Sequence, residues 1–254
     1  KEEELAETFE EGKMRFLEFL VKNGANYFKQ KKDAISRYLN ELKESLQEYI
    51  RNEGYIREIQ MRLTYRGTFG VSSTFGQIPF EVGLFIHPYF NVPYIPASSI
   101  KGAIRSAYHN MIIQEGTASE REAKEQCDFI FGDKMSAGLV GFTDALPIEE
   151  GENGYILYPD IINPHYKNAR DETSVQPNPI IFLTVAPGTK FKFYMYVIKE
   201  RGNRRIKISH LSEKPEPDLN KLGWLDRALL YGLALGVGAK TALGYSQFEV
   251  TKYE

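Results

Sequence analysis

Residues 219–250, LNKLGWLDRALLYGLALGVGAKTALGYSQFEV, constrain the fold more than any other part of the chain. The leucines recur at helical spacing, and aromatic and small residues widen the apolar face until little of a helix there could meet water. Gly236, Gly238 and Gly244 then bracket residues 239–241, after which apolar residues resume as in a strand. We therefore expect a buried helix, a glycine-rich loop and a strand. Glycines at this spacing permit positive φ angles or a close approach by another chain.

This order of elements argues against a nucleotide-binding loop. Dinucleotide fingerprints and P-loops need a strand before the glycines and a helix after them, because the phosphate lies at the N-terminus of that helix. Here the helix comes first, and the sequence contains no Gly-x-x-x-x-Gly-Lys run.

The composition describes a globular chain of one large or two small domains. Its 254 residues, 42% of them hydrophobic, are enough to bury a real core. No apolar run is long enough to cross a membrane, and the charged start KEEELAETFEEGK is no signal peptide. Cys127 is the only cysteine, which excludes an intrachain disulfide and a thiolate-rich zinc site and suits a cytoplasmic protein. The net charge of −2 argues weakly against nonspecific nucleic-acid binding, so any anion site must be a local cluster.

Residues 1–54 read as an N-terminal helical extension, separate from a main domain at 55–254. Apolar residues recur at roughly helical spacing, and we expect two helices, broken near Asn23 and Gly24. Asp33 is a candidate cap for the second helix, and Gly54 ends it. The Lys and Glu runs indicate either a solvated face or a docking surface for a partner.

Two following segments carry cations. Residues 55–69 alternate apolar and polar side chains, which predicts a half-buried strand whose outer face is basic and includes Arg66. After a proline-punctuated stretch, Ser98 or Ser99 can cap a helix that places Lys101 and Arg105 on one face. Free backbone N–H groups, a hydroxyl and a nearby cation can bind an anion at such a helix start. The alternative is an ordinary capped helix with solvated cations.

The remaining segments complete the fold prediction. A helix is expected from residue 118 to 132, a short strand near 140, a long irregular loop over 158–180, and strands between 180 and 211. The order predicts an α+β fold of the ferredoxin-like type, with an antiparallel sheet, helices on one face and long insertions.

The residues leave alternative chemistries open. Asp160, His165, Asp171 and Glu172 on the 158–180 loop could do general acid or base chemistry, as in an endoribonuclease. The run from Ser98 to Lys101 also has the Ser-x-x-Lys spacing of serine acyl-transferases, and Lys240, Thr241 and Ala242 precede a strand as the second element of that class does. Ala242 stands where that class has glycine, and its Ser-Asp-Asn element is missing.

A metal site and an RNA site are the other two possibilities. Asp128, Asp133 and Asp144 match neither a calcium loop nor a His-rich zinc spacing, and we expect neither a metal nor a cofactor. In an RNA-binding protein, the glycine loop and the helix start would present backbone N–H groups and cations to successive phosphates. Four aromatic residues could stack on unpaired bases: Phe69, Phe75, Tyr89 and Phe90. Most of them are nonetheless expected in the core.

Four motifs resemble one family. LALGVGAKTALGYSQFEV resembles the terminal glycine-rich loop of the RAMP superfamily, the RNA-binding subunits of CRISPR effector complexes, and YIPASSIKGAIRSAYH resembles its helix start. FGD followed by GLVGFTDALP, and PDIINPHY followed by NPIIFLTVAPGTKFKF, are most similar to the sixth subunit of the type III-B Cmr complex. The resemblance covers about residues 60–250. Ala97 and Ser246 depart from it, since each stands where the family often has glycine.

The resemblance implies a non-catalytic, RRM-like subunit of a type III-B CRISPR ribonucleoprotein in antiviral defence. Such a subunit holds the 3′ part of the guide RNA near the head of the complex, meets target RNA, and contacts backbone, small and capping subunits, with no membrane partner. The resemblance implies RNA contacts at the glycine loop and the helix start, to which we add Arg66 from the basic strand face. The candidate residues are Arg66, Ser98, Ser99, Lys101, Gly102, Arg105, Gly236, Gly238, Lys240, Thr241 and Gly244.

Overall fold

A computed structural model describes residues 2–51, 53–72, 82–162, 180–201, 204–205, 211 and 221–254. The main elements are α1 (Glu2–Ile50), β1 (Gly54–Leu63), α2 (Ala97–Gln114), α3 (Glu120–Phe131), β2 (Val140–Phe142), β3 (Leu146–Glu149), β4 (Leu157–Ile162), β5 (Ile180–Val185), β6 (Lys190–Ile198), α4 (Trp224–Leu235) and β9 (Phe248–Tyr253). Short pieces complete the described chain: η1 (Glu152–Gly154), β7 (Glu200–Arg201), β8 (Arg204–Arg205) and η4 (Thr241–Leu243). Most of the long 158–180 loop, with His165, Asp171 and Glu172, lies outside the described residues, as does Phe75.

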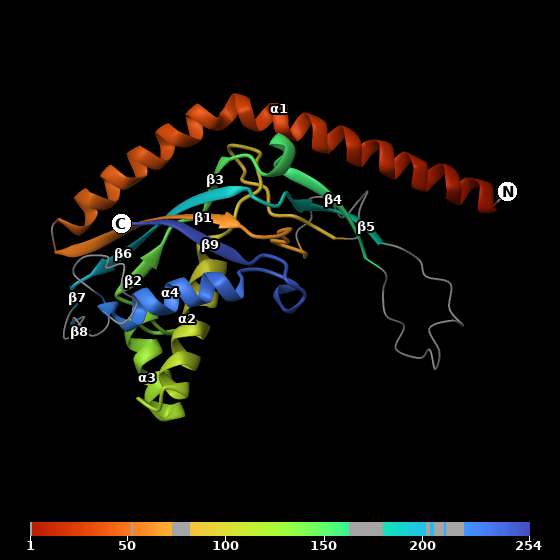
Figure 1. Cartoon of the computed structure of the whole chain (residues 1–254). Helices are drawn as coiled ribbons and strands as arrows, with labels where there is room; N and C mark the ends of the chain where they lie inside the picture. Colours follow the sequence, from red (N-terminus) through yellow and green to blue (C-terminus); the bar gives the residue numbers. More distant parts are fainter. Residues whose placement is uncertain are drawn as a thin grey trace, which may run out of the picture.

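An antiparallel sheet in the order β2-β6-β1-β9 forms the centre of the fold, and β3 also pairs with β6. The alternation predicted for the first strand is confirmed over residues 59–63, where Ile59, Met61 and Leu63 are buried. It fails before them, because Arg57 and Glu58 are buried as well. β1 pairs with β6 and β9, so the glycine-loop strand lies directly beside it. Helices α2, α3 and α4 lie together on one face of this sheet (Figure 1). The predicted α+β fold, with an antiparallel sheet and helices on one face, is confirmed.

The predicted break in the N-terminal segment is wrong, because residues 2–50 form one continuous helix, α1. A Cβ added at Gly24 would lie 3.0 Å from Leu157 Cδ1, so this glycine lets the helix approach β4 rather than ending it. Burial of Leu17, Phe28 and Ile35 in the common core outweighs the helix penalty of one glycine, about 1 kcal/mol. Helix α1 covers the sheet face opposite α2 to α4 (Figure 1). The boundary at residue 54 stays a prediction.

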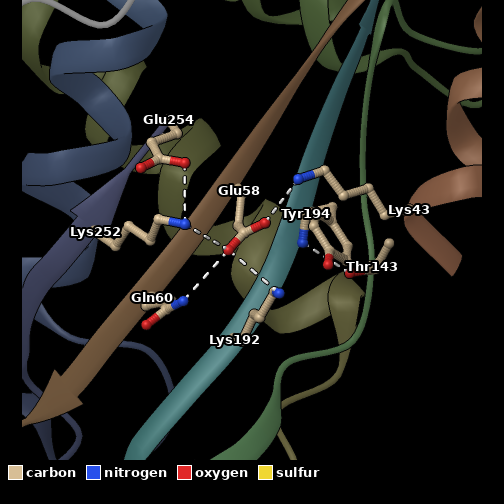
Figure 2. Close-up of polar contacts among 8 residues, drawn as sticks. All are labelled: Lys43, Glu58, Gln60, Thr143, Lys192, Tyr194, Lys252 and Glu254. Atoms are coloured by element: carbon tan, nitrogen blue, oxygen red, sulfur yellow. Dashed lines mark hydrogen bonds and ion pairs between the residues drawn. The ribbon is translucent and has the colours of Figure 1, made fainter. Parts of the chain in front are cut away.

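A buried carboxylate ties α1 to the sheet. Glu58 of β1 accepts hydrogen bonds from Lys43 Nζ of α1 at 2.9 Å and from Lys252 Nζ of β9 at 3.1 Å. Lys192 Nζ of β6 lies 3.2 Å from the same carboxylate, so three ammonium groups from three elements surround it (Figure 2). Burial alone would raise the pKa of Glu58, but the three lysines outweigh it and lower this pKa to about 2. Glu58 is therefore ionised at neutral pH and links α1, β6 and β9.

Helix α2 begins differently from the prediction. Pro96 is its N-cap, and neither Ser98 nor Ser99 caps it, because both lie within the first helical turn. The first N–H, from Ala97, is instead accepted by Asp144 Oδ1 at 2.7 Å, which places a carboxylate at the positive end of the helix. The first-turn serines are thus left to face outward.

Helix α4 is the buried helix that the leucine spacing predicted. It crosses α2 closely, since a Cβ added at Gly232 would lie 3.2 Å from Ala107 Cβ and 3.3 Å from Ile104 Cα. This close crossing brings the glycine loop after α4 beside the start of α2. No helix in the described ranges is both long and apolar enough to cross a membrane.

Candidate nucleic-acid interface

Backbone hydrogen bonds dock the glycine-rich loop onto the chain that follows β1. The Ala239 N–H donates to Thr68 O at 3.0 Å, and the Ser246 N–H donates to Arg66 O at 2.9 Å. Gly238, with φ of 126°, is required for this contact, because a Cβ there would lie 2.6 Å from Thr68 O. Gly238 therefore serves the packing of the loop on its own fold.

Ser246 accounts for one departure from the family pattern. Its φ of 59° is the left-handed conformation that glycine adopts most easily. The serine is fully buried, and its Oγ accepts the Thr68 N–H at 2.9 Å. A side-chain hydrogen bond here offsets the strain of a non-glycine residue, so the loop keeps its shape.

The tip of the loop leaves backbone donors open. In the part of the chain that the structure describes, no acceptor is found for the N–H groups of Gly238, Lys240, Thr241 and Ala242. Lys240 has a φ of 60°, and consecutive N–H groups around such a left-handed residue form an anion-binding concavity. Within the described ranges its ammonium also has no ion-pair partner. The loop tip can therefore receive an anion such as a phosphate.

A groove of about 530 Å³ lies between this loop and the start of α2. Its lining residues are Gly70, Val71, Ser72, Phe85, Ser99, Gly102, Ala103, Gly236, Gly238, Ala239 and Thr241. Two segments that the sequence singled out separately thus form two walls of one groove. Residues 70–72 and Phe85 form the third wall, which sequence reasoning missed. Their signal was only the turn glycine Gly70, whose φ is 79°.

Gly102 has no packing role of its own. It lies inside α2, is exposed, and a Cβ built on it would meet nothing within 4 Å. A helical glycine costs about 1 kcal/mol relative to alanine, and here no neighbour in the chain requires it. The residue leaves the groove floor open to a ligand that approaches the helix backbone.

The other candidates on α2 face away from the groove. Ser98 and Lys101 line a second cavity on the opposite side of the first turn. Burial, and then the Arg105 guanidinium, lower the pKa of the Lys101 ammonium. Arg105 itself pairs with Asp128 and donates to Gly132 O at 2.6 Å, which ties α2 to the end of α3.

Arg66 is engaged within the fold as well. Its guanidinium pairs with Asp160 and lies 5.0 Å from the centre of the Tyr158 ring. It does not line the groove, but its carbonyl accepts the Ser246 N–H. Arg66 therefore stabilises the glycine-rich loop through its backbone carbonyl and does not line the groove.

Asp160, the described member of the ribonuclease hypothesis, is buried at 5% exposure. Besides Arg66 it accepts the Tyr245 hydroxyl at 2.5 Å and the Ile161 N–H at 2.9 Å. Burial, and then the hydrogen bond to Asp160, raise the pKa of Tyr245 to about 12. This carboxylate serves as a structural link between β4 and the glycine loop.

The two remaining chemistries are not assembled in the described residues. Ser98 and Thr241, which the acyl-transferase hypothesis needs together, line different cavities. Asp128, Asp133 and Asp144 lie apart in separate contacts, and the described chain contains no cluster of three or more possible metal ligands. Of the aromatic candidates, Phe69 is buried and Tyr89 is exposed, while Phe90 packs on Tyr38.

The sequence matches one family model and two characterised relatives. A family model described as the RAMP superfamily matches residues 67–249. The chain is 32% identical over 254 residues to the CRISPR system CMR subunit Cmr6 of Saccharolobus solfataricus, which covers 100% of this chain and 78% of that protein. It is 30% identical over 225 residues to the Cmr6 subunit of Pyrococcus furiosus, covering 66% of this chain and 61% of the relative.

A solved structure agrees with these relatives. One chain of the type III-B Cmr-beta complex bound to cognate target RNA, determined by cryo-EM, matches with a TM-score of 0.75 and 32% identity. The match covers 100% of this chain and 76% of that one. The chain therefore belongs to the RAMP superfamily and, within it, to the Cmr6 subunits of type III-B CRISPR complexes.

Proposed function

We propose that the chain is a non-catalytic subunit that holds the 3′ part of the guide RNA by its phosphates, in the groove between α2 and the glycine loop. The observation that carries this proposal is the convergence on one groove of open backbone N–H groups, an exposed helical glycine and, beside them, a cation without an ion pair. These are the groups that bind a phosphate backbone at close range.

The groove suits a single strand held without sequence readout. Its polar side chains are small hydroxyls, from Ser72, Ser99 and Thr241, and backbone groups supply the other donors. Phosphate contacts of this kind fix the path of a strand but do not distinguish bases. The subunit could therefore hold guides of different sequence.

A relative supports the assignment to RNA. The structure that matches this chain over its full length is of a Cmr complex bound to cognate target RNA. By analogy, we infer that this chain works in a cytoplasmic ribonucleoprotein that captures target RNA, beside backbone, small and capping subunits.

Helix α1 supplies a surface for those neighbours. Its N-terminal half extends past the central sheet (Figure 1). There Phe16 and Phe19 are 43% and 59% exposed, and their rings stack at 6.4 Å. Exposed aromatic pairs are typical of protein contacts, which fits a scaffolding role.

The chemistry of Asp160 argues for scaffolding over cleavage. A general base needs a carboxylate free to accept a proton from the attacking group. Asp160 is buried and already bonded to Arg66, Tyr245 and its neighbouring backbone. We expect no RNA cleavage by the purified subunit.

Lys240→Gly tests the proposal. Glycine accepts a φ of 60° without strain, so the melting temperature should not fall, while the cation beside the groove is removed. Single-strand RNA affinity, measured by filter binding against salt concentration, should fall, and the salt slope should become shallower by about 0.7. Asn153→Gly, at another left-handed position, and Lys124→Ala, an exposed lysine of α3, are matched controls and should leave binding unchanged. Unaltered affinity and slope in Lys240→Gly would contradict the proposal.

A further inference from the structure

The second cavity, on the far side of the first turn of α2, also has a volume of about 530 Å³. It opens at the edge strand β2, and Ser98 and Lys101 contribute to its wall, together with the loop at 131–139, Tyr196 and Arg201. We propose that this cavity receives one unstacked nucleotide of the RNA strand, with its phosphate at Lys101 and its base against Tyr196. This inference rests on the proposed function, because it extends the path of the strand held in the groove.

Charge in the cavity favours an anion. Lys101, Lys134 and Arg201 line it, and none of them has an ion-pair partner within the described ranges. Asp133 is the one carboxylate among the described lining residues, and its Oδ1 accepts the N–H groups of Met135 at 2.8 Å and Ser136 at 2.7 Å. Arg105, one turn along α2, adds positive potential while its own hydrogen bonds go to Asp128 and Gly132. A phosphate would offset this excess of cations.

An aromatic wall completes the site. Gly141 of β2 is paired with Tyr196 of β6, and a Cβ at Gly141 would lie 2.2 Å from Tyr196 Cζ. The absent side chain lets the Tyr196 ring lie across the edge strand, where it meets the Tyr49 ring of α1 at 6.1 Å and also lines the cavity. Met135, 93% exposed, stands at the rim and offers a polarisable thioether. Bases of single-stranded RNA stack on such surfaces without regard to their identity.

The cavity and the groove flank the first turn of α2 and share no lining residue. Ser98 lines the cavity and its neighbour Ser99 lines the groove, so both open at one helical turn. The Ser98 N–H, which has no acceptor in the described chain, lies between them. A strand crossing this turn would place adjacent nucleotides in the two sites. The volume falls in the range of about 300–1,000 Å³ that suits one small ligand, rather than a duplex.

Titration of adenosine 5′-monophosphate and uridine 5′-monophosphate into the full chain by calorimetry tests the inference. Both should bind, and more tightly than inorganic phosphate or the free nucleosides. Lys101→Gln should weaken them about tenfold, since it removes one charged hydrogen bond. Lys124→Gln, the same change at an exposed position of α3, should bind like the wild type.

The outcomes separate this inference from the proposed function. If neither monophosphate binds, if Lys101→Gln binds them as well as the wild type, or if inorganic phosphate binds equally tightly, the nucleotide site is refuted. Strand binding that still depends on Lys240 would in that case leave the groove proposal standing. If strand binding does not depend on Lys240, the groove proposal fails whatever the monophosphates do.

Discussion

Replacing Gly102 should move stability and RNA binding in opposite directions. The Cβ direction is open, so leucine at this helical position should stabilise the chain by roughly 0.8 kcal/mol, the difference in helix propensity. For a chain of this size that gain raises the melting temperature by about 2–3 °C. The same side chain enters the groove and should hold a strand away from the loop N–H groups. Loss of one or two charged hydrogen bonds weakens binding about 10- to 100-fold.

Gly12→Leu is the matched control. Gly12 is also helical and exposed, with nothing within 4 Å of its Cβ direction, but it lies in α1 far along the chain from the groove. Thermal melting and filter binding to single-stranded RNA should show both variants stabilised and only Gly102→Leu weakened in binding. Equal RNA affinity in both variants would refute the claim that Gly102 keeps the groove open.

Two further changes test the supports of the site. Glu58→Gln should destabilise the chain by about 2 kcal/mol above pH 5, since a pKa of about 2 against 4.5 corresponds to about 3 kcal/mol before screening by nearby solvent. The depressed pKa stabilises the fold above pH 4.5, and this stabilisation is lost as the pH falls towards 2. Urea titrations should therefore show the difference in unfolding free energy between wild type and variant shrinking from pH 4.5 towards pH 2. A difference that stays constant with pH would contradict this. Ser246→Ala should cost about 1–3 kcal/mol in chemical denaturation, because the Thr68 N–H loses its acceptor, and Ser246→Gly should cost less because it relieves the left-handed φ. Equal losses in the two variants would exclude strain at this position.

Local patterns in the sequence predicted the elements of the site. The leucine spacing and the glycines of residues 219–250 predict α4, the loop and β9, because each depends on residues close in the chain. Helical geometry also explains why residues in the first turn of α2 line two separate sites. Ser99 and Gly102 are three residues apart and share the groove, while Ser98 and Lys101, likewise three apart, share the cavity.

Contacts between distant residues could not be predicted in this way. The local sequence predicts a serine cap for α2, but Asp144, 47 residues away, accepts the first N–H of the helix instead. The basic face of the first strand predicts an RNA contact for Arg66, but Asp160, 94 residues away, pairs with its guanidinium. The continuity of α1 depends on Leu157 packing at Gly24, a tertiary contact that helix propensity does not contain.

The most direct test of the central claim is the path of the RNA on this subunit. A complex assembled with a guide RNA that carries 4-thiouridine near its 3′ end can be cross-linked, digested and mapped by mass spectrometry. The account predicts cross-links on peptides containing residues 97–105 and 236–245, which form the walls of the groove. Cross-links confined to α1 or to the β4–β5 hairpin, with none at these two segments, would contradict it.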